Sequence, residues 1–336
     1  MNIYLFFAMI FSFIMTFITV PYAIKKLSNS GKTVTDVYKK GNPEIPTNGA
    51  IVVFFTVLVI CASWPLFNRI FNRLSGTNEL IFLDSIDMTI LLVISLFAIF
   101  GIIDDLLDLS WSNKLFIPLL FSFPVFTIYD PVSITVPFFG DFDMSSQVAF
   151  GLLVSDIFKV IVIPIYIMVV PNLINMHSGF NGLQTGLSSI LMATIIIKCA
   201  LDSAFDNLLV PCAFLGGIVA FWYYNKYPAS IFEGNIGSLS IGSIIGVTLV
   251  LKNYLFFGFF ILLPHITDFL MFLYLKFKKR PFVKFGRVDD KGILVVPNPI
   301  KMKFLLPYYY NMTEPQAVHS LYFITILFCL GGLIIF

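Results

Sequence analysis

Three carboxylates lie close together where an apolar run ends, in the segment from Gly101 to Asp108. Asp104 and Asp108 are four residues apart and would share one face of a helix, whereas Asp105 would point about 100° away. Acids this crowded repel one another, so a cation must offset them or one must remain protonated. Carboxylate oxygens suit Mg²⁺ that carries bound phosphates. The cluster therefore predicts phosphate chemistry, with a solvated acidic helix end as the alternative.

Basic residues that could offset these charges lie in two places. Lys114 starts the next apolar run, where it could pair with Asp108, hold a phosphate or anchor the chain at the membrane surface. The segment 36–49 carries Lys39 and Lys40 among prolines and glycines, which indicate a structured turn. These two lysines could bind phosphate or only follow the positive charge of cytoplasmic loops.

A segment rich in amides and glycines follows another apolar run, with Asn172, Asn175, Gly179, Asn181 and Gly182. Polar residues are costly at membrane depth and usually face a wet functional site. Amides donate and accept hydrogen bonds, which suits a base edge or a metal-bound diphosphate, and glycines allow close backbone approach. Interhelical hydrogen bonding would explain one amide more easily than three. A second Gly-rich segment, 227–239, contains Asn235 and leads into an apolar run, where backbone N–H groups favour anions, with helix packing as the alternative role of its glycines.

The composition places these residues in a membrane protein. Hydrophobic residues make up 58% of the 336 residues and charged residues 12%, with a mean hydropathy of +0.92. Soluble domains carry about 25% charged residues, which excludes that class. The first twenty residues have no basic start and no cleavage signal, so we expect an anchor helix there. The four cysteines lack metal-ligand spacing and imply no disulfide.

Apolar runs predict an all-α polytopic fold with about ten transmembrane helices, forming one integral membrane domain over residues 1–336. We expect the spans at 3–24, 49–70, 87–104, 114–130, 150–171, 183–201, 208–225, 236–251, 254–277 and 317–336. The odd-numbered connections hold 16 of the 21 Lys and Arg residues, which predicts that they are cytoplasmic and that both termini are outside. The longest of these loops is 277–316.

Every polar motif above falls in an odd-numbered connection. Solvated loops would explain the charges but not the clustered Gly, Asn and Asp, so we expect one cytoplasmic-face active site built from five loops. A transporter or flippase would instead place polar residues at mid-membrane in broken helices, often with internal repeats, whereas the polar motifs here gather at one end of the spans and the sequence shows no repeat.

Taken in order, these segments resemble the polyprenyl-phosphate N-acetylhexosamine-1-phosphate transferases. The resemblance covers nearly the whole chain, through Asp36, Lys39 and Ile45-Pro46, then Asp104-Asp105-x-x-Asp108, Lys114, Asn172-x-x-Asn175, Gly179-x-Asn181-Gly182-Leu183, and Tyr227-Pro228-Ala229 with Gly234-Asn235. Ser178 and Asn181 stand where bacterial members carry acids, and the loop 284–292 is similar to archaeal dolichol-type members. The resemblance therefore implies an archaeal plasma-membrane enzyme with its active site facing the cytoplasm, or an endoplasmic reticulum enzyme if the source is eukaryotic.

The implied reaction moves N-acetylglucosamine-1-phosphate from UDP-GlcNAc to dolichyl or another polyprenyl phosphate and releases UMP, as the first step of lipid-linked N-glycan assembly. The resemblance implies that Asp104, Asp105 and Lys114 are catalytic and that Asp105, Asn175 and Asn235 hold Mg²⁺, and it leaves open which Asp acts as a base. It further implies that Asn181 reads the uracil and that the 277–316 loop recognises the sugar nucleotide. The other implied substrate contacts are Asp36, Lys39, Asp108, Asn172, Gly179, Gly182 and Arg287.

One departure from the family pattern lies at Gly234-Asn235, where many members have Gly-Asp with the Asp as a Mg²⁺ ligand. An amide oxygen can still bind Mg²⁺ but brings no charge. The close alternative for function is the same reaction with another UDP-N-acetylhexosamine. The family also includes dimers, so a homodimer is an expected partner state, and no nucleic acid is expected as a partner.

Overall fold

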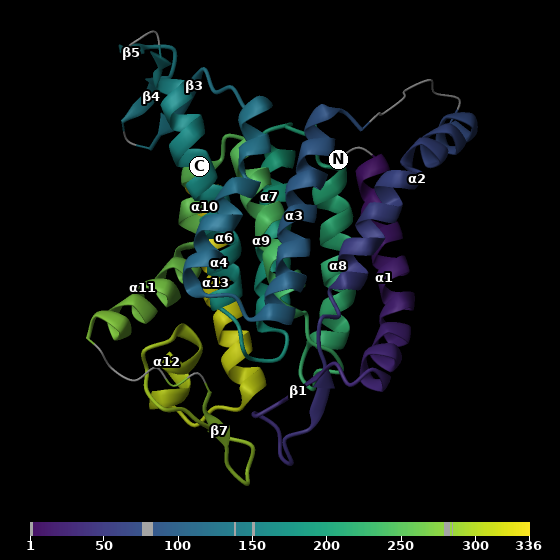
Figure 1. Ribbon diagram of the computed structural model, residues 1–336, viewed down its shortest axis with the longest axis vertical. Helices are drawn as coiled ribbons and strands as arrows, with labels where there is room; N and C mark the ends of the chain where they lie inside the picture. The colour runs from purple at the N-terminus through teal and green to yellow at the C-terminus, as the bar shows by residue number, and fades with distance from the viewer. Residues whose placement is uncertain (1–2, 76–82, 138, 150–151, 279–282, 284) are drawn as a thin grey trace.

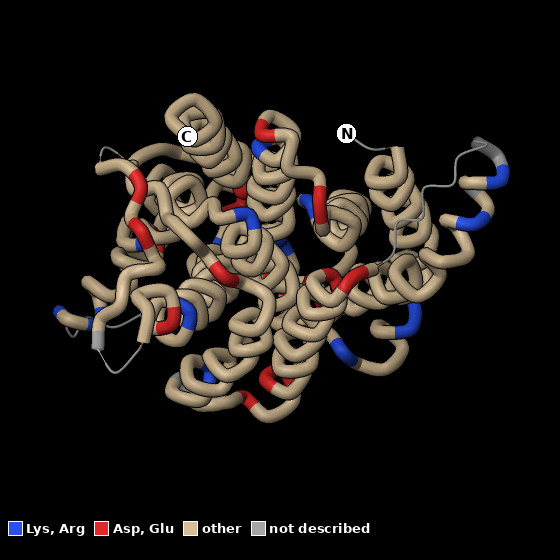
Figure 2. Tube along the Cα trace, turned by 90° about the horizontal axis from the view of Figure 1, so that it is seen from above, with Lys and Arg blue, Asp and Glu red and all other residues tan. Residues whose placement is uncertain are grey.

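The chain folds as a bundle of long apolar helices joined by short loops and small hairpins (Figure 1). The computed structural model describes residues 3–75, 83–137, 139–149, 152–278, 283 and 285–336. Figure 2 shows that charged positions are sparse along the helices. The helices are α1 (Ile3–Asn29), α2 (Ile51–Ser75), α3 (Ser85–Leu107), α4 (Trp111–Phe121), α5 (Val154–Ile157), α6 (Ile163–Met176), α7 (Leu183–Leu201), α8 (Leu209–Asn225), α9 (Gly234–Leu251), α10 (Leu255–Ile261), α11 (Leu263–Phe277), α12 (Met302–Tyr309) and α13 (Glu314–Ile335).

The expected polytopic membrane fold is confirmed. Within the described residues, 7 helices are long and apolar enough to cross a membrane, or up to 8 if the bent pair α10 and α11 is one span. One of the seven, Val154–Met176, combines α5, the π-helical turn η2 (Phe158–Val162) and α6. The short apolar helix α8 has 17 residues and lies where the seventh span was expected.

Two expected spans differ from the structure, and proline explains both. The run 114–130 forms only the 11-residue α4, followed by a 3₁₀ turn, η1 (Phe123–Thr127), that has Pro124 in its first turn. The run 254–277 breaks into α10 and α11, which bend by 66°, and Pro264 lies in the first turn of α11. Proline has no N–H group and cannot continue the hydrogen-bond ladder of the preceding helix, so it favours these breaks.

The described residues form four two-stranded antiparallel hairpins outside the long helices, where the sequence predicted no strands. They pair β1 (Thr33–Thr35) with β2 (Glu44–Pro46), β3 (Ser133–Val136) with β4 (Gly140–Asp143), β5 (Gln147–Ala149) with β6 (Leu152–Leu153), and β7 (Arg287–Val288) with β8 (Leu294–Val295). Figure 1 shows β1 and β7 at one end of the bundle, and β3 to β5 with both chain ends toward the other. The termini therefore lie on the same side, as the span count predicted.

The close packing of α3 against α9 positions the acidic cluster. A Cβ atom added at Gly101 on α3 would lie 2.6 Å from the backbone of Asn235 and Ile236 at the start of α9. This glycine therefore lets the end of α3 approach the first turn of α9, which brings Asp104 and Asp105 beside Asn235.

Candidate functional site

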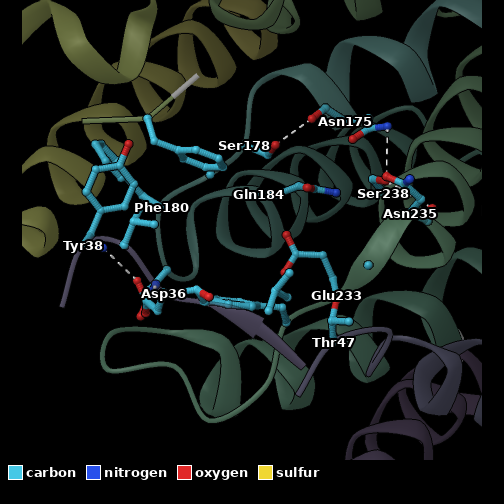
Figure 3. Close-up of a pocket in the computed structure, with 18 of the residues that line it drawn as sticks. Asp36, Tyr38, Thr47, Asn175, Ser178, Phe180, Gln184, Glu233, Asn235 and Ser238 are labelled. Atoms are coloured by element: carbon cyan, nitrogen blue, oxygen red, sulfur yellow. Dashed lines mark hydrogen bonds between the residues drawn. The ribbon is translucent and has the colours of Figure 1, made fainter. Parts of the chain in front are cut away.

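The polar loops meet around one pocket at the β1 and β7 end of the bundle, with a volume of about 300 Å³ (Figure 3). Its lining comes from all five odd-numbered connections, which is the arrangement expected for one site built from five loops. The lining residues are Val34, Thr35, Asp36, Val37, Tyr38, Thr47, Asp105, Asn175, Ser178, Gly179, Phe180, Asn181, Gln184, Phe232, Glu233, Gly234, Asn235, Ser238 and Phe285.

Asp104 is held behind the wall of this pocket by three donors. Its side chain lies 2.9 Å from the Lys114 ammonium and accepts hydrogen bonds from the Leu109 N–H at 3.1 Å and the Asn235 amide at 2.9 Å. Asp104 is only 4% exposed and is outside the residues that line the pocket. Its carboxylate therefore joins α3 to Lys114 on α4 and to Asn235 on α9.

Asp105 faces the pocket instead. Its carboxylate accepts a hydrogen bond from the backbone N–H of Asn235 at 3.0 Å, and it lines the pocket beside that residue. Of the two acids that the sequence left as alternatives, Asp105 is the one placed to meet a bound substrate.

Asp108 departs from its expected position. The expectation that it shares a helix face with Asp104 is wrong, because α3 ends at Leu107 and Asp108 adopts a left-handed conformation with φ of 46°. The Asp108 side chain is fully exposed and lies 3.8 Å from the Lys114 ammonium. Lys114 thus contacts both acids, although Asp104 and Asp108 do not share a helix face.

Oxygen donors for a cation gather at the Asp105 end of the pocket. Asn175 donates to the Asn235 side-chain oxygen at 3.4 Å, and both residues line the pocket with Asp105. Among the described residues no three Asp, Glu, His or Cys side chains converge as a metal site would require. One carboxylate with two amide oxygens nevertheless fits Mg²⁺, which usually takes one or two carboxylates plus substrate phosphates. These three residues would hold the ion together with a bound diphosphate.

The Asn235→Asp variant tests this Mg²⁺ assignment by adding a second carboxylate to the proposed site. Asn235 donates its amide to the buried Asp104 carboxylate at 2.9 Å, and a second carboxylate there would repel the first. We expect thermal unfolding of the variant without Mg²⁺ to occur about 3–5 °C lower than that of the wild type, and added Mg²⁺ to reverse much of the loss. Scanning fluorimetry with and without EDTA measures this. Equal Mg²⁺ responses of variant and wild type would contradict the assignment.

Asn181 is the centre of a second hydrogen-bond network, at the other side of the pocket. Its amide donates to Asp36 at 3.0 Å and accepts from the Ala229 N–H at 2.8 Å, while its backbone N–H donates to Glu314 at 2.5 Å. Lys39 pairs with the same Asp36 carboxylate at 2.8 Å. An amide offers two N–H groups and two lone pairs, so the bonds within the described residues leave one of each for a ligand.

The other expected contacts divide between the pocket and its surroundings. Gly179 lines the pocket with φ of +98°, and a Cβ atom at this position would clash with the Lys303 ammonium. Gly182 immediately precedes α7 and lies against the Lys226 backbone, outside the pocket lining. Asn172 donates to the Met168 carbonyl of its own helix at 2.9 Å, and Arg287 is exposed on β7. The structure thus brings neither Asn172 nor Arg287 into the pocket.

Sequence reasoning missed several residues of the pocket. Burial raises the pKa of Glu233, which accepts a hydrogen bond from Asn225 at 2.9 Å, and burial raises the pKa of Tyr38 to about 12. Gln184 and the ring of Phe232 also line the pocket. Each lies within or beside a segment singled out from the sequence, and that adjacency was the available signal.

Known proteins are similar to this chain over most of its length. Residues 88–253 match the family model described as Glycosyl transferase family 4. A Sulfolobus acidocaldarius protein is 28% identical over 293 residues, which cover 85% of this chain and 82% of that protein, and its provisional name is UDP-N-acetylglucosamine–dolichyl-phosphate N-acetylglucosaminephosphotransferase. A phospho-N-acetylmuramoyl-pentapeptide-transferase of Borrelia duttonii is 30% identical over 321 residues, covering 82% of this chain and 83% of that protein. A provisionally named glycosyltransferase of Methanocaldococcus jannaschii is 27% identical over 329 residues, or 97% of this chain.

Proposed function

Because the chain belongs to glycosyl transferase family 4, we propose that it transfers N-acetylglucosamine-1-phosphate from UDP-GlcNAc to dolichyl phosphate and releases UMP. The general activity of this family is the transfer of an N-acetylhexosamine-1-phosphate to a polyprenyl phosphate. The observation that best supports the proposed reaction is the pocket itself, which has oxygen donors at one end and the Asn181 amide at the other.

In the proposed reaction, a phosphate oxygen of the lipid bonds to the β-phosphorus of the UDP-sugar. The bond from that phosphorus to the bridging oxygen breaks, and UMP leaves with the electron pair. A phosphate monoester has a second pKa near 6, so the lipid phosphate is largely ionised at neutral pH and needs no strong base. The main difficulty is that two anions must approach each other.

In the proposed reaction, the residues at the Asp105 end of the pocket reduce the repulsion between the two anions. Mg²⁺ would supply charge stabilisation to the diphosphate, held by Asp105, Asn175 and Asn235. Lys114 is partly exposed and pairs with Asp104 and Asp108, and the exposed apolar residues Leu106 and Leu107 lie between these two acids at the end of α3. We assign this edge to the acceptor, because a polyprenyl chain can remain among apolar side chains while its phosphate reaches the Lys114 ammonium.

The donor nucleotide would occupy the rest of the pocket. The N–H and lone pair that Asn181 retains match the carbonyl and N–H of a uracil edge. Phe232 lines the pocket and offers a ring on which a base could stack. The loop 277–316 contributes Phe285 to the lining, and we assign recognition of the sugar to this loop.

A transfer assay with purified protein tests the proposal. We expect Mg²⁺-dependent UMP release and lipid-linked sugar with UDP-GlcNAc and dolichyl phosphate, and at least tenfold less with UDP-glucose, which lacks the N-acetyl group. EDTA should remove the activity. Transfer from UDP-GalNAc instead of UDP-GlcNAc would support the same reaction with a different sugar. The absence of transfer from every UDP-sugar tested would refute the proposed function.

A further inference from the structure

A buried amide with an unused donor points into the pocket from the first turn of α7. Gln184 is 4% exposed and lines the pocket, and its side-chain nitrogen has no hydrogen-bond partner among the described residues. Figure 3 shows this side chain extending into the space between Asn175 and Glu233. A buried donor without a partner loses its hydration and gains nothing in return, so it destabilises the unliganded protein.

The surroundings of Gln184 indicate an anionic partner. It is the second residue of α7, a 19-residue helix whose first turn lies at the pocket, and the positive end of a helix dipole favours anions. Amide N–H groups can donate to phosphate oxygens but cannot accept from them, which matches the unused atom. A helix start alone would be weak evidence, and here it coincides with the unpartnered Gln184 nitrogen.

We propose that Gln184 binds a phosphate oxygen of the nucleotide and is thereby a determinant of donor affinity. The assignment rests on the proposed function, since it takes the bound molecule to be a UDP-sugar. Gln184 would make this contact to UMP as well, because the product keeps the phosphate next to the ribose. The destabilisation caused by the unpartnered Gln184 donor in the empty pocket would be relieved when the nucleotide binds.

The variant Gln184→Met separates this role from a structural one. Methionine keeps the shape and removes the donor, so we expect its thermal unfolding to occur about 2 °C higher than that of the wild type. Isothermal titration calorimetry should show UMP and UDP-GlcNAc binding at least tenfold more weakly, with uridine unchanged. A structural role would instead lower the unfolding temperature and leave affinity intact.

Ser188→Ala is the matched control. Ser188 lies one turn further along α7, is fully buried and also has an unpartnered side-chain oxygen within the described residues, but it is outside the pocket lining. This variant should gain stability without any change in UMP affinity. Gln184→Glu gives a second test, because its carboxylate should repel phosphate and weaken UMP binding by more than tenfold.

Two outcomes overturn the inference separately from the function. Unchanged UMP affinity in Gln184→Met and Gln184→Glu, in a wild type that binds UMP, would refute the contact alone. Equal losses for UMP and uridine would refute the phosphate assignment. A wild type that binds neither UMP nor any UDP-sugar would refute the proposed function, and the inference would fail with it.

Discussion

Replacing Asp105 with Asn should lower sugar-phosphate transfer by about 10³-fold while the protein remains folded. Asp105 is the acid of the cluster that lines the pocket, and it supplies the one carboxylate of the proposed Mg²⁺ site. Asparagine keeps an oxygen that can accept the N–H of Asn235, now at 3.0 Å from the carboxylate, so the contact between α3 and α9 should survive. UMP release at saturating Mg²⁺ and substrates measures the loss.

Asp108→Asn is the control for this prediction. Asp108 belongs to the same sequence motif, but its side chain is fully exposed and outside the pocket lining. We expect the variant to keep activity within about threefold of the wild type, since it only weakens a contact of 3.8 Å to Lys114 that is exposed to solvent. A larger loss in Asp108→Asn than in Asp105→Asn would contradict the assignment of the pocket-facing acid.

The membrane class and the meeting of the five loops could be predicted from the sequence because both depend on coarse properties. Apolar length sets the spans, and the distribution of Lys and Arg sets which loops share a side. The loops that contribute Asp36, Asp105, Asn181, Asn235 and Phe285 are far apart in the chain, yet the alternation of spans alone places them at one end of the bundle.

The different roles of neighbouring residues could not be predicted, because tertiary contacts decide them. Asp104 and Asp105 are equivalent in sequence, but the close approach of α3 and α9 at Gly101 leaves one beside Lys114 and the other at the pocket. Asn172 lies in the same amide-rich segment as Asn175, but its amide donates to the Met168 carbonyl one turn earlier. Likewise, only the folded arrangement shows that the Gln184 side-chain nitrogen has no hydrogen-bond partner within the part of the chain that the structure describes.

The second large effect is expected for Lys114→Met, which would leave the Asp104 carboxylate buried without a cation. Asp104 would keep the Leu109 N–H and the Asn235 amide, both of which are neutral donors. Breaking a buried ion pair costs about 3–5 kcal/mol, and the 32% exposure of the Lys114 side chain reduces this by solvent screening to about 1–3 kcal/mol. Transfer should fall as well, because the proposed acceptor site loses its charge.

A double variant distinguishes these two consequences of losing Lys114. Adding Asp104→Asn to Lys114→Met removes the stranded charge, so thermal stability should return to within about 1 °C of the wild type while activity stays low. Lys114→Arg should retain both stability and part of the activity, because it keeps the charge. A double variant as unstable as Lys114→Met would show that the Asp104 carboxylate is not the group that Lys114 neutralises. In that case the ion pair at 2.9 Å would not explain why α4 packs beside the end of α3.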